Sequence, residues 1–252
     1  MANKREDDDK KLFDDIAANY VKKDLTPYCR IARKQRLERS LKGIKLPIKN
    51  MLEVGCGAGF TVDYLKDKYV NYTGVDYSKN LINYAIEHNG STGVKFECLN
   101  INEFDSGIKF DVILMIGVLH HIPEPEDAIE TLARILSPQG TIVVNEPQSG
   151  NPLIGLLRKI RKKIDNNYSE DQVEFTEDEI RSIFERCGYD VKTYSQGILS
   201  TPLAESKILP GFIGMPLAWI AVILDPLLEK LFSISFLKNL TWNVVAQARQ
   251  KG

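Results

Sequence analysis

The chain has 252 residues and a formal net charge of −1, with 33 basic and 34 acidic side chains. This length suffices for one α/β domain with a substantial core, and the balanced charge without a long basic run makes a nucleic-acid partner unexpected. The four cysteines form no C-x-x-C pair, which predicts no metal site and no disulfide framework and fits a cytoplasmic protein.

The N-terminal region predicts an arm followed by helices. Residues 1–10 mix charges without a hydrophobic period, so we expect a disordered arm that lacks the apolar core of a secretory signal. Within the N-terminal helical region 11–48, apolar residues recur at helical spacing as far as residue 42, which predicts two helices separated near Thr26-Pro27. We assign residues 11–252 to a single domain.

The central segment 49–147 alternates short apolar runs with amphipathic stretches. Strands are expected at 49–54, 71–76, 94–99, 110–116 and 140–145, and helices at about 58–69, 79–89 and 125–136. Ser78 is placed to cap the helix 79–89. Strands that alternate with helices predict an α/β fold with a Rossmann-like, doubly wound sheet.

The C-terminal half, 148–252, contains further regular elements. Residues 152–164 form a basic amphipathic stretch, and Thr176 with Glu179 predicts a capping box for a helix over 176–187. Gly188 ends that helix and leads into a strand at 189–195. The chain closes on a strand at 240–249.

An apolar insertion at 202–237 precedes the last strand. Its prolines and glycines make a straight membrane-spanning helix unexpected, because proline removes a backbone donor. Three interpretations remain open: a helical cap over the active site, a dimer face, or a hydrophobic lid that binds an apolar acceptor or dips into a membrane surface.

The first chemical signal is a glycine loop at the end of the first strand. The loop has the spacing G-x-G-x-G at Gly55, Gly57 and Gly59, whereas a dinucleotide loop reads G-x-G-x-x-G and would have glycine in place of Phe60. Glu53 precedes the loop and is poorly placed beside a pyrophosphate, because like charges repel. It suits an amino-bearing ligand instead.

The second signal is Asp76, which ends the second strand in the run Gly74-Val75-Asp76-Tyr77-Ser78. A carboxylate at this position can accept two hydrogen bonds from a ribose diol. The glycine loop and Asp76 together therefore predict a site for a nucleoside-bearing cofactor.

With the run Leu52-Glu53-Val54-Gly55-Cys56-Gly57-Ala58-Gly59 and with Asp76, the chain resembles the class I S-adenosylmethionine-dependent methyltransferases, type 11-like members included. The resemblance covers residues 10–147 well, 170–195 moderately and 197–240 poorly. It implies a seven-stranded sheet with an antiparallel last strand. It also implies S-adenosyl-L-methionine as cofactor, with S-adenosyl-L-homocysteine as product, and methyl transfer to the oxygen or carbon of a small or lipid-like acceptor.

The resemblance also implies a set of cofactor-binding residues. Asn100 stands where the family usually has Asp, and its carbonyl oxygen can still accept from the adenine amine, although Asn102 offers a competing register. Tyr20 resembles a lid tyrosine, with packing in the core as the alternative. The full expected set is Glu53, Gly55, Cys56, Gly57, Gly59, Asp76, Tyr77, Ser78, Asn100, Ile101, Gly117 and Tyr20.

His120 and His121 follow the fourth strand, where the reacting end of a ligand lies in such a sheet. Either histidine could take a proton from a hydroxyl acceptor, which makes both candidate catalytic residues. The alternative is that one of them caps the next helix or packs beneath the site.

Three other functions stay open on sequence grounds. An NAD-dependent oxidoreductase could use a similar fold, and a protein could bind S-adenosylmethionine without turnover. A membrane-peripheral scaffold built on 202–237 is the third. The sequence leaves the acceptor and the oligomeric state undetermined.

Overall fold

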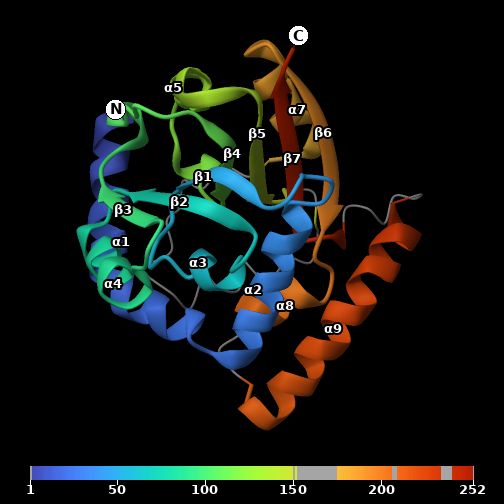
Figure 1. The fold of residues 1–252 in the computed structure, drawn as a ribbon. Coiled ribbons are helices and arrows are strands. Elements are labelled where there is room, and N and C mark those ends of the chain that lie inside the picture. The colour runs from blue at the N-terminus through green and yellow to red at the C-terminus, as the bar shows by residue number, and fades with distance from the viewer. Residues whose placement is uncertain (1, 150, 152–174, 206–208, 234–239, 252) are drawn as a thin grey trace.

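The computed structural model of the chain describes residues 2–149, 151, 175–205, 209–233 and 240–251 (Figure 1). Its centre is a seven-stranded sheet in the order β3-β2-β1-β4-β5-β7-β6. The strands are β1 (Ile48–Val54), β2 (Tyr69–Asp76), β3 (Val94–Cys98), β4 (Phe110–Ile116), β5 (Leu136–Pro147), β6 (Tyr189–Gln196) and β7 (Asn243–Gln250). All pairings among the five strands β1, β2, β3, β4 and β5 are parallel, whereas β7 runs antiparallel to both β5 and β6. The predicted doubly wound sheet is confirmed.

Alternate residues of the central strands face two cores, as expected for a sheet covered by helices on both sides. Leu52 and Ile113 pack with side chains of α5 (Pro125–Ile135) and α7 (Glu177–Arg186). Met51 and Leu114 pack on the other face with side chains of the N-terminal helices. Both faces of β1 and β4 are therefore buried, and what these strands present to a ligand lies at their ends.

The N-terminal helices are α1 (Ala2–Asp24) and α2 (Pro27–Ser40), so the predicted break near Thr26-Pro27 is confirmed. α1 begins at Ala2, which differs from the expected disordered arm over 1–10. Tertiary contacts hold this helix: Asp9 meets His121, and Asp14 accepts a hydrogen bond from Ser78 Oγ at 2.6 Å. Charge pattern alone gave no sign of these partners.

Between β1 and β3 the helices are α3 (Thr61–Tyr64) and α4 (Lys79–Asn89). α3 is much shorter than the helix expected over 58–69. Gly59 before it and Asp67 after it both have left-handed backbone, at φ 75° and 67°, and this interrupts helical hydrogen bonding. For α4 the prediction is confirmed, and Ser78 Oγ accepts from Leu81 N.

Around β6 the predicted features also appear. α7 starts with the expected capping box, in which Thr176 and Glu179 each satisfy a backbone donor of the other. Gly188 follows α7 with φ 83°, in the left-handed region that favours glycine. The basic stretch 152–164 lies outside the described residues.

The insertion between β6 and β7 contains α8 (Ser200–Glu205) and α9 (Gly211–Phe232). α9 continues through Pro216 and Pro226, where the sequence suggested interruption. Pro226 removes the donor that would bond Val222 O, and Gln35 Nε2 of α2 donates to that oxygen at 2.5 Å instead. A contact with α2 thus compensates for the proline.

Candidate active site

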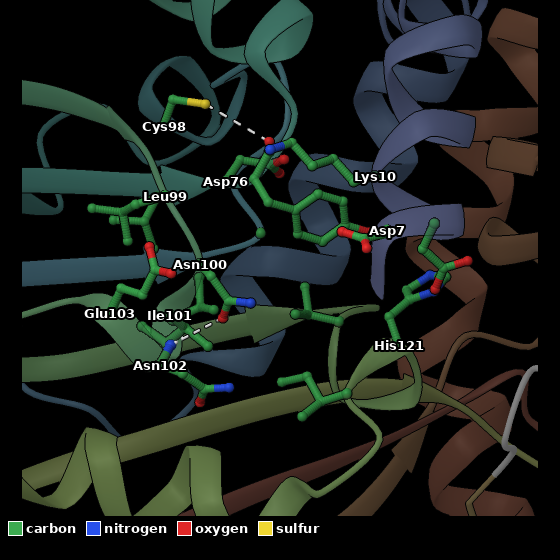
Figure 2. Close-up of a pocket in the computed structure, with 17 residues that line it drawn as sticks. Asp7, Lys10, Asp76, Cys98, Leu99, Asn100, Ile101, Asn102, Glu103 and His121 are labelled. Atoms are coloured by element: carbon green, nitrogen blue, oxygen red, sulfur yellow. Dashed lines mark hydrogen bonds and ion pairs between the residues drawn. The ribbon is translucent and has the colours of Figure 1, made fainter. Parts of the chain in front are cut away.

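A cavity of about 550 Å³ opens at the carboxyl ends of β1, β2 and β3 and the start of the segment after β4 (Figure 2). In a doubly wound sheet this edge, where the strand order reverses between β1 and β4, is where ligands bind. The lining comprises Asp7, Asp9, Lys10, Val54, Gly55, Val75, Asp76, Tyr77, Cys98, Leu99, Asn100, Ile101, Asn102, Glu103, Val118, His121 and Ile122.

The glycine loop is tied to the end of β2. Gly55 N and Cys56 N both donate to Val75 O, at 2.8 and 3.1 Å. Gly55 has φ 69°, and a β-carbon added there would lie 2.3 Å from a methyl carbon of Val118. Only glycine therefore lets the end of β1 approach the segment after β4 so closely. Cys56, Gly57 and Gly59 belong to the same loop but lie outside the cavity lining.

Asp76 lines the cavity, and two backbone N–H groups hold its carboxylate in place. Its Oδ1 accepts from Ser78 N and its Oδ2 from Gly57 N, each at 2.9 Å. Burial raises the pKa of Asp76, and the two backbone donors act in the opposite direction. Since a carboxylate has about four acceptor positions, both oxygens can still accept a hydrogen bond from a ligand.

The segment after β3 forms one wall of the cavity. Asn100 Oδ1 accepts from Asn102 N at 3.0 Å and so starts a short 3₁₀ turn over Ile101–Glu103. Asn100 and Ile101 line the cavity as expected, and Asn102 joins them, so both registers considered from the sequence reach the site. Tyr77 also lines the cavity, as expected, and the segment Asn100–Asn102 is seen in Figure 2.

Glu53 is buried at the end of β1 and lies outside the cavity lining. Thr61 Oγ1 donates to its Oε1 at 2.9 Å, and the Tyr72 hydroxyl donates to its Oε2. Burial raises the pKa of Glu53 to about 8, against the effect of these two donors. Both oxygens are thus engaged within the protein, and the binding of an amino group by Glu53 stays a prediction.

The two histidines occupy different environments. His121 lines the cavity, and its Nδ1 lies 3.1 Å from Asp9 Oδ2 of α1. His120 is buried outside the lining, and its Nδ1 lies 2.6 Å from Glu146 Oε2. The two imidazole rings are 4.0 Å apart between centroids. Of the pair, only His121 is positioned to reach a ligand in the cavity.

Glu146, at the end of β5, supports this arrangement and was not foreseen from the sequence. It is fully buried, and its Oε1 accepts from Val118 N at 2.9 Å and Leu119 N at 2.8 Å. One carboxylate therefore holds both the backbone after β4 and His120. The signal available in the sequence was an acidic residue close to the end of an apolar strand.

Three other expected residues lie outside the cavity lining. Tyr20 packs edge-on against Phe13, and Arg33 stands over its ring. Gly117 donates to Asn145 O at 2.8 Å, and Ser78 is buried as the cap of α4. In place of Tyr20, α1 contributes Asp7, Asp9 and Lys10, which lie in the stretch expected to be disordered.

The region 52–142 matches a family model described as "Methyltransferase domain". A protein named ubiquinone biosynthesis O-methyltransferase from Coxiella burnetii is 31% identical over 110 residues, which cover 42% of this chain and 47% of that protein. The match thus spans about half the length of the relatives with that name.

Solved structures show the same fold. A possible histamine N-methyltransferase from Thermotoga maritima superposes with a TM-score of 0.64 at 19% identity, covering 96% of this chain and 99% of that one. A magnesium protoporphyrin IX methyltransferase from Synechocystis with bound SAH gives 0.56 at 15% identity, with 89% and 86% covered.

Proposed function

We propose that this chain is a class I S-adenosylmethionine-dependent methyltransferase, which transfers a methyl group from S-adenosylmethionine to a small or lipid-like acceptor. The observation that carries the proposal is that Gly55 and Asp76 line the same cavity. A ligand there can approach the backbone of Gly55 closely, because glycine has no side chain, and can also donate hydrogen bonds to the Asp76 carboxylate.

The residues of the cavity fit the cofactor. Asp76 would accept hydrogen bonds from the ribose diol, and Gly55 would let the methionine part lie against the loop, since both line the cavity. Tyr77, Asn100 and Ile101 would hold the adenine. When bound, S-adenosylmethionine supplies an electrophilic methyl group on a positively charged sulfur. Because that sulfur is already a good leaving group, positioning of the acceptor supplies much of the acceleration.

His121 is our candidate for the base toward a hydroxyl acceptor. The Asp9 carboxylate beside Nδ1 favours a proton on that nitrogen, which leaves Nε2 as the nitrogen that takes a proton from the acceptor. His120 serves as a support, because it is buried beside Glu146. Methylation at carbon would need this base less than methylation at oxygen.

Two other functions are less well supported. For an NAD-dependent oxidoreductase, a pyrophosphate would need a helix N-terminus after the loop, but α3 has only four residues and Phe60 packs in the core. Binding without turnover would leave the His121–Asp9 pair at the cavity without a role. The apolar α9 supports a lipid-like acceptor and a peripheral membrane contact through 202–237.

The test of the donor site is calorimetric titration with S-adenosylhomocysteine, with NAD as the comparison. We expect binding of the first alone. Asp76→Asn should weaken this binding roughly tenfold or more, since a buried hydrogen bond to a charged group is lost. Asp190→Asn, an exposed change on the far edge strand β6, is the matched control. Folded protein that binds NAD and not S-adenosylhomocysteine would refute the proposal.

A further inference from the structure

α9 presents a long apolar face to solvent. Phe212, Trp219, Ile223, Leu227 and Leu231 follow one another at intervals of seven or four residues, so they share one stripe of the helix. Their exposed fractions are 80%, 54%, 64%, 64% and 66%. α9 is long and apolar enough to cross a membrane by length and composition alone, yet only 22% of its most apolar window is buried. It is therefore not the core helix of this fold.

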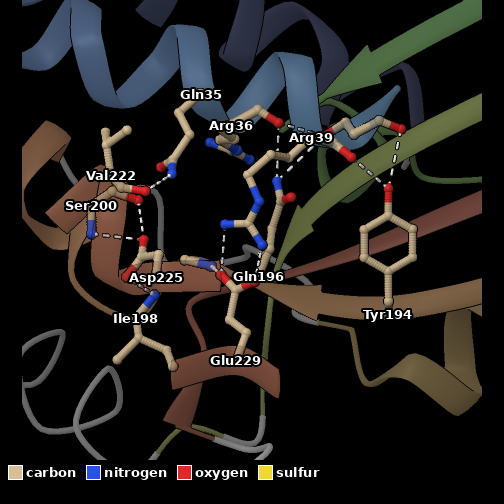
Figure 3. A network of polar contacts seen from close by, with 12 residues as sticks. Gln35, Arg36, Arg39, Tyr194, Gln196, Ile198, Ser200, Val222, Asp225 and Glu229 are labelled. Carbon is tan, nitrogen blue, oxygen red and sulfur yellow. Dashed lines mark hydrogen bonds and ion pairs between the residues drawn. The ribbon is translucent and has the colours of Figure 1, made fainter. Parts of the chain in front are cut away.

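The opposite face of α9 is fastened to α2 and to the loop before α8 (Figure 3). Gly214 lies against the ring of Tyr28, and Gln35 Nε2 bonds Val222 O. Glu229 accepts from Arg39 Nη1 at 2.8 Å and from Gly197 N at 2.6 Å. These contacts fix which face of the helix points outward.

Asp225 makes the attachment stronger still. It is fully buried and accepts from Leu199 N at 2.7 Å and Ser200 N at 3.1 Å, and so caps the start of α8. A spanning orientation would break these bonds and carry Asp225 and Glu229 into hydrocarbon, which is unfavourable. A spanning orientation is therefore excluded. The surface that α9 offers for contact is its exposed long side, while the opposite side stays packed on α2.

The chemistry of the outer stripe favours lipid over protein. Protein interfaces carry about one hydrogen bond per 100–200 Å² and a polar rim, whereas this stripe consists of aliphatic and aromatic side chains. A stable dimer also needs about 20–30 residues on each side, and one stripe of a single helix supplies far fewer. An acyl-chain surface needs neither hydrogen bonds nor a complementary shape.

We propose that α9 lies flat at the boundary between headgroups and acyl chains of a membrane, with Phe212, Trp219, Ile223, Leu227 and Leu231 inserted. Helices with a wide apolar face bind membranes in this orientation. Because Lys230 is the one charged residue exposed on α9, the contact depends on apolar burial and little on lipid charge. The membrane contact can be tested without any assay of methyl transfer, and it places α2 on the membrane side of the molecule.

The test uses the full-length chain and vesicles of phosphatidylcholine alone, in flotation at about 0.15 and 0.5 M salt, where exposed charges are increasingly screened. We expect the protein to float in both. Ile223→Glu should lower the partition coefficient roughly tenfold or more, since burial of one isoleucine accounts for that much. Ile86→Glu, at a 55% exposed isoleucine of α4, is the matched control and should float like the wild type.

A second measurement reports on the helix itself. In Trp242→Phe, Trp219 is the remaining tryptophan, and its emission should shift to shorter wavelength when vesicles are added. Folded wild-type protein that stays in the dense fraction would overturn the proposal. So would flotation that requires phosphatidylglycerol and disappears at high salt, or a dimer in sedimentation that Ile223→Glu dissociates. Titration of Ile223→Glu with S-adenosylhomocysteine tests the donor site separately, and we expect wild-type affinity.

Discussion

At the scale of single residues, the site depends on three carboxylates at strand ends, which have different tasks. Asp76 faces the cavity and keeps acceptor capacity for a ligand. Glu146 and Glu53 lie behind it and hold other parts of the protein: one supports His120 and the backbone after β4, and the other bonds Thr61 and Tyr72. The distinction between a ligand-facing and a supporting acid came from geometry, since all three lie at strand ends.

Glu53 should make the protein less stable as pH rises. Its pKa is raised to about 8 in the folded state by burial, from an ordinary value of 4.5. The folded protein therefore retains a proton that the unfolded chain releases, and the free energy of unfolding falls through that pH window. Glu53→Gln should remove this loss, which is on the order of 1.4 kcal/mol per pH unit.

Urea denaturation at several values between pH 5 and pH 8 measures the effect of Glu53. The matched control is Glu87→Gln, because the Glu87 side chain is 77% exposed. We expect the control to follow the wild type, while the two curves for Glu53→Gln and wild type diverge toward high pH. Parallel curves would show that Glu53 ionises normally.

Substitution of His120 should mainly lower the stability of the protein, whereas substitution of His121 should mainly lower the rate of methyl transfer. His120→Ala leaves Glu146 buried without its imidazole, so we expect a loss of about 2–3 kcal/mol in the free energy of unfolding. His121→Ala should cost less stability and leave S-adenosylhomocysteine binding unchanged, but slow methylation of a hydroxyl acceptor about a hundredfold. Denaturation, calorimetry and turnover measure these effects, and equal destabilisation by both changes would contradict the assignment.

At the scale of elements, α9 shows how a sequence irregularity is absorbed by packing. Pro226 leaves Val222 O without its helical donor, and Gln35 from α2 replaces it. The same pair of helices carries the Arg39–Glu229 ion pair (Figure 3). α9 is therefore an integral part of the fold.

Gln35→Ala should lower the free energy of unfolding by about 1–2 kcal/mol, because a part-buried carbonyl loses its partner. In a Pro226→Ala background the helix regains the missing N–H, so the same change at Gln35 should cost clearly less. Denaturant unfolding of the four proteins gives the coupling energy. An equal cost in both backgrounds would rule out the compensation.

At the scale of the whole molecule, α1 closes the cavity over the sheet edge. It reaches the site through Asp7, Asp9 and Lys10, and it reaches α4 through Asp14. Because both contacts lie on one helix, a ligand in the cavity should restrain α1 and the start of α4 together.

Hydrogen exchange with and without S-adenosylhomocysteine measures this restraint. We expect slower exchange in segments 7–14 and 76–82 when the ligand is bound, since the ligand stabilises the closed arrangement. Strand β6, at the far edge of the sheet, serves as the internal control. Protection confined to the glycine loop would mean that α1 is not part of the binding site.

The sequence by itself determined the order of strands and helices and two parts of the site. The short apolar runs of the strands, the capping box at Thr176 and the helix 79–89 are local patterns that report directly on local structure. The glycine loop and Asp76 are also local, since a turn that requires left-handed backbone selects glycine within a few positions. These features could be predicted because neighbours in the chain decide them.

Only the tertiary structure decided which distant residues complete the site and which face of α9 is exposed. His121 meets Asp9 across 112 positions, and Gln35 meets Val222 across 187. Glu53 and Tyr20 fit a family pattern, yet packing engages the oxygens of one within the protein and places the other outside the cavity lining. Helical and strand periodicity carries information over a few residues, so contacts of this length depend on how the elements pack.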